Sequence, residues 1–459
     1  MALAAMLGGC HIYKPYKRPG IDTSGLYRDT ESETDTLAAE QGPAFANVPY
    51  EEVFTDPFLK ALIDEGLEKN VDMRAAMLRV EEAQTLLTAA HLSFLPSLTL
   101  APRGEVSSLD GSTPARTYTL PAAASWEVDL FGKLLNADRG QRASLLLSQE
   151  ARQAVRVKLI GGISTAYYTL LMLDSQTEVT ETNRDLMAET VRTMKAMKEA
   201  GMTNEAAVAR TSAALSQINA SLEKLYKTRR ETENTLSVLL DRAPGHIERG
   251  TLGEQQLPGF YKAGVPLSLL ENRPDVRLAE AKLASAYYRT NQARSAFYPN
   301  IKLTATGGWT NGANGRVIQN PAVTLWNIVG QLAQPIFAHG KLVANLKVTK
   351  REEEIARMEY RRAILDAGRE VSDALYAMGA ADRRLSQNTI RASELNRAVE
   401  ATAALFEAGK ASYLEVITAR QSLLAAQMDE AADKFEQLRS IVSLYSALGG
   451  GRMLAEDVK

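Results

Sequence analysis

Phe94-Leu95-Pro96-Ser97-Leu98 recurs as Phe297-Tyr298-Pro299-Asn300-Ile301, 203 residues further along the chain. Leu130-Phe131-Gly132-Lys133-Leu134 recurs in the same way as Phe337-Ala338-His339-Gly340-Lys341-Leu342, with the Gly-Lys pair displaced by 208 residues. A third pair keeps the 208-residue offset, namely Glu199-Ala200-Gly201 and Glu407-Ala408-Gly409. Because these landmarks keep their order and spacing, the chain is a duplicated unit of about 200 residues.

Proline placement predicts the helices on either side of these landmarks. Residues 122–243 and 336–459 contain no proline and are rich in strong helix formers. We predict long helices over about 133–200 and 341–408. Gly201 and Gly409 interrupt the helical pattern there, and a returning helix follows each, ending near Asp241 or Leu448. A shorter helix is predicted before each strand pair, over 57–93 and 274–296, with proline in its first turn.

Two pairs of extended segments lie between these helices, over 97–108 with 117–128 and over 300–310 with 322–333. Ile301, Leu303 and Ala305 alternate with polar residues. In the first pair, the residues of one parity are apolar, namely Tyr118, Leu120, Ala122, Ala124, Trp126 and Val128. Such alternation is typical of strands, and about ten residues suit a tilted membrane strand. Pro102 and Pro121 fall inside the first pair, where a central soluble strand would tolerate them poorly.

The predicted helices carry heptad-like apolar spacing, for example Leu424, Met428, Ala431, Phe435 and Leu438. An ordinary core stripe of a helical bundle explains any single helix equally well. A helix over 133–200 would nevertheless span about 100 Å, which is beyond the diameter of a globular domain. Each chain offers four candidate strands, whereas the smallest closed membrane barrels have eight. If these strands lie in a membrane, several chains must share one barrel.

Composition excludes several classes of protein. The chain has 53 Lys plus Arg against 55 Asp plus Glu, a net charge of −2, which argues against a nucleic-acid partner. Four scattered histidines and one cysteine leave little for a metal site, and we expect neither a metal nor a cofactor. The sequence contains no GxSxG, P-loop, HExxH or CxxC motif, so an enzyme is the least supported class. The uncharged stretch 159–173 is too short and too polar for a transmembrane helix.

Cys10 follows an apolar run that ends in small residues, as in an export signal. Leu7-Gly8-Gly9-Cys10 resembles the bacterial lipobox, in which the cysteine becomes the lipidated first residue of the mature protein. The alternative is an unused N-terminal thiol. No Lys or Arg precedes the short apolar run, and a misassigned start codon would explain that departure.

The stretch Leu269-Leu270-Glu271-Asn272-Arg273-Pro274-Asp275-Val276-Arg277-Leu278-Ala279-Glu280 resembles the inter-repeat signature of TolC-type outer-membrane efflux factors, specifically the NodT-like lipoprotein branch. The resemblance implies an α+β membrane protein built from a duplicated helix–β-hairpin–long-helix unit. It implies a homotrimer in which a 12-stranded β-barrel in outer-membrane lipid continues into a periplasmic α-helical barrel. Its implied partners are a periplasmic adaptor protein and an inner-membrane resistance–nodulation–division transporter.

On this basis we divide the chain into six parts. Residues 1–9 are the signal and lipobox region, and 10–55 an extended N-terminal segment. The first repeat covers 56–243 and the second 274–448. Between and after them lie a linker, 244–273, and a tail, 449–459.

The resemblance also suggests a periplasmic gate near the turns at Gly201 and Gly409. One family acidic position falls on Glu415, and a second falls on Thr418, which is not acidic. Glu415 repeated around a symmetry axis would attract cations and repel anions, although a solvated surface glutamate is an equally good interpretation. Arg420 and Arg210 are candidates for bracing a closed tip, with weak surface ion pairs as the alternative. For Arg273, Pro274, Asp275, Arg277 and Glu280 a structural role suffices, since Asp275 suits the first turn of a helix.

We therefore predict a passive outer-membrane exit duct for small molecules in a tripartite efflux pump. A duct of the same fold for type I protein secretion is the nearest alternative. A soluble coiled-coil scaffold is the alternative from another class.

Overall fold

The computed structural model describes residues 13–21, 48–108, 114–256, 273–310 and 324–450. Cys10, residues 1–9 and most of 10–55 and 449–459 lie outside these ranges, as do most of both predicted connectors between paired strands. The chain forms two compact units, and each takes segments from both repeats. Unit 1 contains 77–151 and 277–363 with the N-terminal 1–22, and unit 2 contains 23–76, 152–276 and 364–459.

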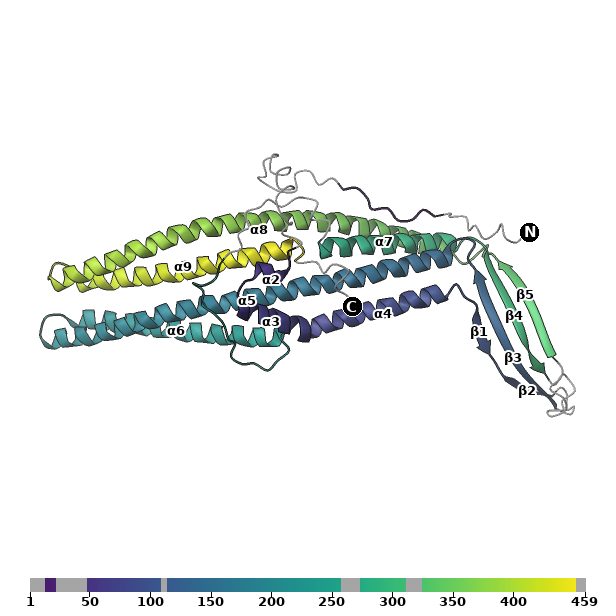
Figure 1. The fold of residues 1–459 in the computed structure, drawn as a ribbon, viewed down its shortest axis with the longest axis horizontal. Coiled ribbons are helices and arrows are strands. Elements are labelled where there is room, and N and C mark those ends of the chain that lie inside the picture. The colour runs from purple at the N-terminus through teal and green to yellow at the C-terminus, as the bar shows by residue number, and fades with distance from the viewer. Residues whose placement is uncertain (1–12, 22–47, 109–113, 257–272, 311–323, 451–459) are drawn as a thin grey trace. The chain divides into compact units, whose positions relative to one another are not determined.

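The long helices confirm the duplication (Figure 1). They are α5, Lys133–Glu199, α6, Glu205–Leu239, α8, Lys341–Glu407, and α9, Tyr413–Ala447. Helices α8 and α9 begin and end 208 residues after α5 and α6, their counterparts in the first repeat. Helix α5 forms a hairpin with α6, and α8 forms one with α9. Absence of proline from both regions explains why these helices run without a break.

The predicted helix 57–93 is wrong in one respect, because the structure divides it into α3, Pro57–Lys69, and α4, Val71–Leu92. Asn70 separates them: its side chain accepts a hydrogen bond from the Met73 N–H at 3.0 Å and donates one to the Leu239 carbonyl at 2.9 Å. The short helix α2, Tyr50–Val53, was not predicted. Helix α7, Pro274–Ser295, agrees with the predicted 274–296. It has the same length as α4, 22 residues.

The strands form one antiparallel sheet in unit 1, in the order β1-β3-β4-β5 with β2 also paired to β3. Their bounds are Ser97–Leu100 for β1, Arg103–Ser107 for β2, Ala115–Val128 for β3, Asn300–Thr310 for β4 and Thr324–Ala333 for β5. The predicted apolar parities meet across the sheet, since Trp126 pairs with Leu303 and Val128 with Ile301. The alternation in the sequence therefore marked a real face of the sheet.

The two prolines in the first hairpin explain a break in its edge strand. Strands β1 and β2 share one register against β3 and are separated only by Ala101 and Pro102. The Ala101 N–H donates to the Pro121 carbonyl at 3.0 Å. Pro121, which has no N–H to return, lies opposite this break. The sheet therefore accommodates a proline inside β3 where the neighbouring ladder is already interrupted.

The core of unit 2 lies along α5 and the returning helices. Fully buried side chains there include Ile160, Ile163, Tyr167, Leu236 and Tyr445. Within the described ranges, no helix is both long and apolar enough to cross a membrane.

Candidate functional site

The two turns between the long helices and their returning helices have the same backbone geometry. Gly201 has φ +71° and Gly409 has φ +69°, in the left-handed region. The following N–H groups, of Met202 and Lys410, donate to the Met197 and Leu405 carbonyls at 2.8 Å in both cases. These bonds close the ends of α5 and α8 in the same way, so the two turns are structurally equivalent.

Glu415 lies in the first turn of α9 and is exposed. Its carboxylate accepts a hydrogen bond from the Ser412 N–H at 3.0 Å. This is the reciprocal contact of a capping box, and a negative charge is favourable at a helix N-terminus. The residue therefore stabilises the start of α9 while keeping its charge in contact with solvent.

The other gate candidates differ in their surroundings. Thr418 is exposed, and its hydroxyl donates to the Leu414 carbonyl of its own helix at 2.8 Å. Arg420 reaches from α9 to α5, where it donates to the Thr190 hydroxyl at 3.1 Å. Arg210 is exposed, and no polar partner for it is found in the part of the chain that the structure describes.

An apolar cluster near these turns was missed by the sequence analysis. Met187 of α5, Ile218 of α6 and Ile417 of α9 are buried together, and Ala214, Leu215 and Tyr413 pack against them. Burial raises the pKa of the Tyr413 phenol, so it stays protonated. Hydrophobic packing, with the Arg420–Thr190 contact, therefore joins α9 to α5 and α6. The heptad spacing of α6 and α9 is the sequence signal from which this contact could have been predicted.

The buried Arg273 is the centre of a polar cluster in unit 2. Its guanidinium donates to the Ala447 carbonyl at 2.5 Å, to Asp275 at 2.7 Å and to Glu370 at 2.6 Å. Burial lowers the pKa of Arg273, but the hydrogen bonds and charges of Asp275 and Glu370 outweigh that effect and raise it overall. The cluster fixes the start of α7 to the end of α9.

Arg277 and Glu280 make contacts within unit 1. Arg277 pairs with Glu150 at 2.8 Å. Glu280 accepts two hydrogen bonds from Arg18, at 2.8 and 2.7 Å. Pro274 begins α7. The five motif residues thus lie at the start of α7 or in contacts that hold α7 in place.

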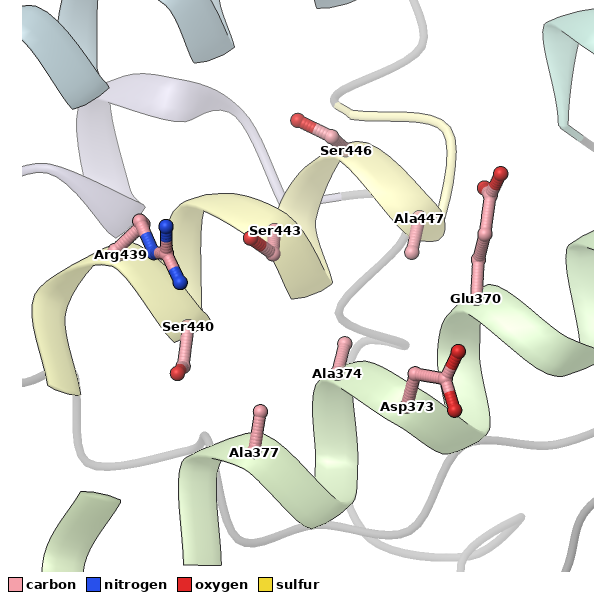
Figure 2. A pocket seen from close by; sticks show the side chains of 9 residues that line it. All are labelled: Glu370, Asp373, Ala374, Ala377, Arg439, Ser440, Ser443, Ser446 and Ala447. Atoms are coloured by element: carbon pink, nitrogen blue, oxygen red, sulfur yellow. The ribbon is translucent and has the colours of Figure 1, made fainter. Parts of the chain in front are cut away.

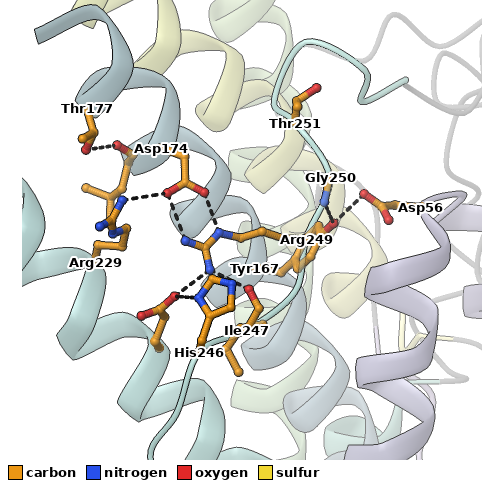
Figure 3. A network of polar contacts seen from close by, with 12 residues as sticks. Asp56, Tyr167, Asp174, Thr177, Arg229, His246, Ile247, Arg249, Gly250 and Thr251 are labelled. Atoms are coloured by element: carbon orange, nitrogen blue, oxygen red, sulfur yellow. Dashed lines mark hydrogen bonds and ion pairs between the residues drawn. The ribbon is translucent and has the colours of Figure 1, made fainter. Parts of the chain in front are cut away.

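A second polar network, also missed by the sequence analysis, fixes the linker after α6 (Figure 3). The Tyr167 hydroxyl donates to Asp56 at 2.6 Å and accepts from the Gly250 N–H at 3.1 Å. Arg249 pairs with Asp174 of α5 at 2.5 Å and with Glu233 of α6 at 2.7 Å. These partners are far apart in the sequence, so neither spacing nor periodicity could have indicated them.

A groove between α8 and α9 has a volume of about 390 Å³ and is lined mainly by alanine and serine. In Figure 2, Ala377 of α8 and Ser440 of α9 point toward one another across it. The acidic residues at its rim are engaged, Glu370 by Arg273 and Asp373 by Arg369. Among the described residues, no group of three His, Cys, Asp or Glu side chains could hold a metal ion.

Comparison with known proteins identifies the family of this duplicated chain. The family model described as outer membrane efflux protein matches residues 62–242 and 265–450. The chain belongs to the outer membrane efflux protein family. The TolC-type resemblance predicted from the 269–280 stretch is confirmed, and so is an efflux role at the outer membrane.

Relatives and solved structures agree with this assignment. The solvent efflux pump outer membrane protein SrpC of Pseudomonas putida is 29% identical over 98% of this chain and 97% of its own length. The cation efflux system protein CusC of Escherichia coli O157:H7 is 26% identical, with the same coverage. A crystal structure of CusC superposes with a TM-score of 0.80 at 26% identity, covering 90% of this efflux protein and 97% of that chain. Both relatives are named as components of efflux pumps or efflux systems.

Proposed function

We propose that this efflux protein is the passive exit duct of a tripartite pump. Three copies would contribute four strands each, with β1 and β2 as one interrupted strand, to a 12-stranded barrel in the outer membrane. The long helices would form a helical barrel that extends into the periplasm. The observation that carries the proposal is the duplicated pair of 67-residue helices attached to a sheet whose apolar side chains, such as Trp326 and Ile328, are exposed in one chain.

The proposed duct would work with two protein partners and the outer-membrane lipid. A periplasmic adaptor would bind the helical barrel, and an inner-membrane resistance–nodulation–division transporter would supply energy and select the cargo. Cys10, if lipidated, would add an anchor in the outer membrane, where one acyl chain alone binds only marginally. The relatives are named for solvent and for cation export. Because such different cargoes share one kind of duct, the cargo here is small molecules chosen by the transporter.

The helical turns are our candidate gate. Glu415 would form an acidic ring around the symmetry axis, without a second ring because position 418 is threonine. Arg420 and Arg210 would help to hold the tip closed. The capping contact of Glu415 is compatible with this role, since the carboxylate remains exposed.

Deleting the gene tests the proposed function. We expect greater susceptibility to toxic small compounds and unchanged levels of exported proteins. The reverse pattern would favour a type I secretion duct. Recovery of the protein in the soluble cytosolic fraction would contradict both ducts and favour the coiled-coil scaffold.

A further inference from the structure

A pocket of about 450 Å³ lies between the second half of α6 and the linker that follows it. Helix α6 contributes Tyr226, Arg229, Arg230, Glu233 and Asn234 to its walls, and the linker contributes residues 244–246. The volume is in the range of sites that bind small molecules. The chemistry of the walls therefore decides what kind of molecule the pocket suits.

Arg229 is held at one wall of the pocket without using its hydrogen-bond donors. Its guanidinium lies 5.4 Å from the centre of the Tyr226 ring, within the range of a cation–π contact. Its Nη1 is 3.6 Å from Oδ1 of Asp174 (Figure 3), which is too long for a hydrogen bond. Both oxygens of Asp174 already accept from Arg249, at 2.5 and 3.0 Å. Arg229 is thus oriented by its neighbours but has no hydrogen-bond acceptor among the described residues.

Arg230 and His246 add further donors to the same pocket. Arg230 is exposed, and the described part of the chain holds no polar partner for it. Nδ1 of His246 lies 3.1 Å from Oε1 of Glu233, so its Nε2 is the ring nitrogen left for a ligand. The same oxygen of Glu233 accepts from Arg249 at 2.7 Å. The carboxylate in the wall is therefore already engaged, whereas the two arginines in the wall are not.

The second repeat shows that the duplicated fold does not require these charges. The 208-residue offset makes Leu438 and Ile441 of α9 the counterparts of Arg230 and Glu233. Leu438 and Ile441 are buried in the core of unit 2. Charged side chains at the same positions of α6 line a pocket instead, so they reflect a property of this surface and not of the repeat.

We propose that this pocket binds a small organic anion through a carboxylate or phosphate group. The planar guanidinium group offers paired donors that match such groups, and these charge-assisted bonds are among the stronger hydrogen bonds in proteins. Arg229 and Arg230 donate to the anion, and His246 contacts it from the linker. Tyr226 and Asp174 keep Arg229 in position. The pocket is larger than one carboxylate or phosphate group, so it also has room for the carbon skeleton that bears the group.

The site is separate from the surfaces that the proposed duct would use. Arg229 precedes Val238, an exposed apolar residue of α6, by nine residues, so the two lie about 180° apart around the helix. Arg229 is also 24 residues from the start of α6 at Glu205, or about 36 Å along the helix from the candidate gate. All its residues belong to one chain, so binding does not depend on how many copies a particle contains.

Titration calorimetry of the detergent-solubilised, full-length protein tests the site. Citrate and glycerol 3-phosphate are the probes for the carboxylate and phosphate classes, and glycerol is the uncharged control. Ionic strength is held constant with sodium chloride, because screening changes the affinity for any anion. The double variant Arg229→Gln with Arg230→Gln removes both guanidinium groups. Arg351→Gln with Arg397→Gln is the matched control, because it removes the same charge from exposed ion pairs on α8.

We expect saturable binding of at least one probe and none of glycerol. The double variant should bind that probe at least about tenfold more weakly, because charge-assisted hydrogen bonds are lost. The control pair should stay within about twofold of the wild type. Arg230→Gln alone, which removes an exposed side chain, keeps the test decisive if the double variant does not fold, and it should weaken binding about threefold or more.

Three outcomes would overturn the site. The first is that neither probe binds the wild-type protein saturably. The second is that the wild type and the arginine variants bind with equal affinity. The third is equal weakening in the control pair, which would show that only the net charge of the protein matters.

Discussion

Gly201 and Gly409 show how single residues fix the ends of the long helices. A Cβ added at either position would meet open space, so packing does not require glycine there. The requirement comes from the positive φ alone, because L-residues with a side chain adopt a positive φ only at a cost in free energy. Each glycine allows the N–H groups beyond it to satisfy carbonyls at the helix end.

Replacing Gly409 with alanine should therefore lower the free energy of unfolding by about 1–2 kcal/mol. Gly253→Ala is the matched control, because Gly253 has open space and no positive φ. We expect that control to change stability by no more than about 0.5 kcal/mol. Denaturant unfolding in detergent measures both, and equal effects would show that the left-handed turn is unimportant.

Arg273 is the residue whose loss should cost most in the family motif. Arg273→Met leaves the Ala447 carbonyl without its donor and two carboxylates without their counter-charge. The carboxylates are about half exposed and can hydrate, so we expect a loss of about 2–3 kcal/mol. Arg397→Met removes an exposed ion pair to Glu394 and should cost less than about 1 kcal/mol. Similar losses in both variants would contradict the buried role.

Glu415 should affect conductance more than stability. In Glu415→Gln an amide oxygen can still accept from the Ser412 N–H, while the charge is lost. We expect weaker cation selectivity of single channels in planar bilayers. Arg420→Ala should increase open time, because the contact with Thr190 is lost. Unchanged conductance and selectivity in both variants would exclude these residues from the gate.

At the scale of elements, β3 and β4 approach each other closely where Pro121 faces Gly308. A Cβ on Gly308 would collide with the Leu120 carbonyl and lie 2.8 Å from the Pro121 Cα, and backbone atoms cannot move aside. Gly308→Ala should therefore destabilise the sheet by about 3 kcal/mol. The neighbouring Gly307 has open space and is the control. Heat-induced mobility shifts on gels compare the two, and equal midpoints would contradict the close approach.

Periodicity and proline placement were enough to predict the long helices to within about a residue, because those helices contain no competing signal. The division at Asn70 was not predictable, since the contact that causes it is with the distant Leu239 carbonyl. In hindsight, Asn70-Val71-Asp72-Met73-Arg74 is the counterpart of Arg273-Pro274-Asp275-Val276-Arg277 at the 203-residue offset. Asn70 and Arg273 donate to Leu239 and Ala447, which are themselves 208 residues apart.

The candidate site was less predictable than the fold. Glu415 could be located through the family resemblance, but its bond to Ser412 depends on where α9 begins. The Arg249 and Tyr167 contacts join segments that only the tertiary structure brings together. A sequence pattern of period two or 3.6 carries information about faces of elements and none about which distant polar groups meet.

For the whole molecule, the duplication explains why one chain leaves surfaces unsatisfied. Two repeats in one chain give one junction between repeats. At this junction β3 pairs with β4, and α9 packs against α5. A ring of repeats needs the same contact at every junction. The edges of the sheet and the exposed apolar side chains of α6 and α8, such as Val238 and Tyr376, are the surfaces that further copies would cover in the proposed duct.

The mass of the protein in a detergent-solubilised particle tests this account most directly, by light scattering with the detergent contribution subtracted. Three copies per particle is the predicted result. A particle that contains a single copy, folded and stable, would contradict it.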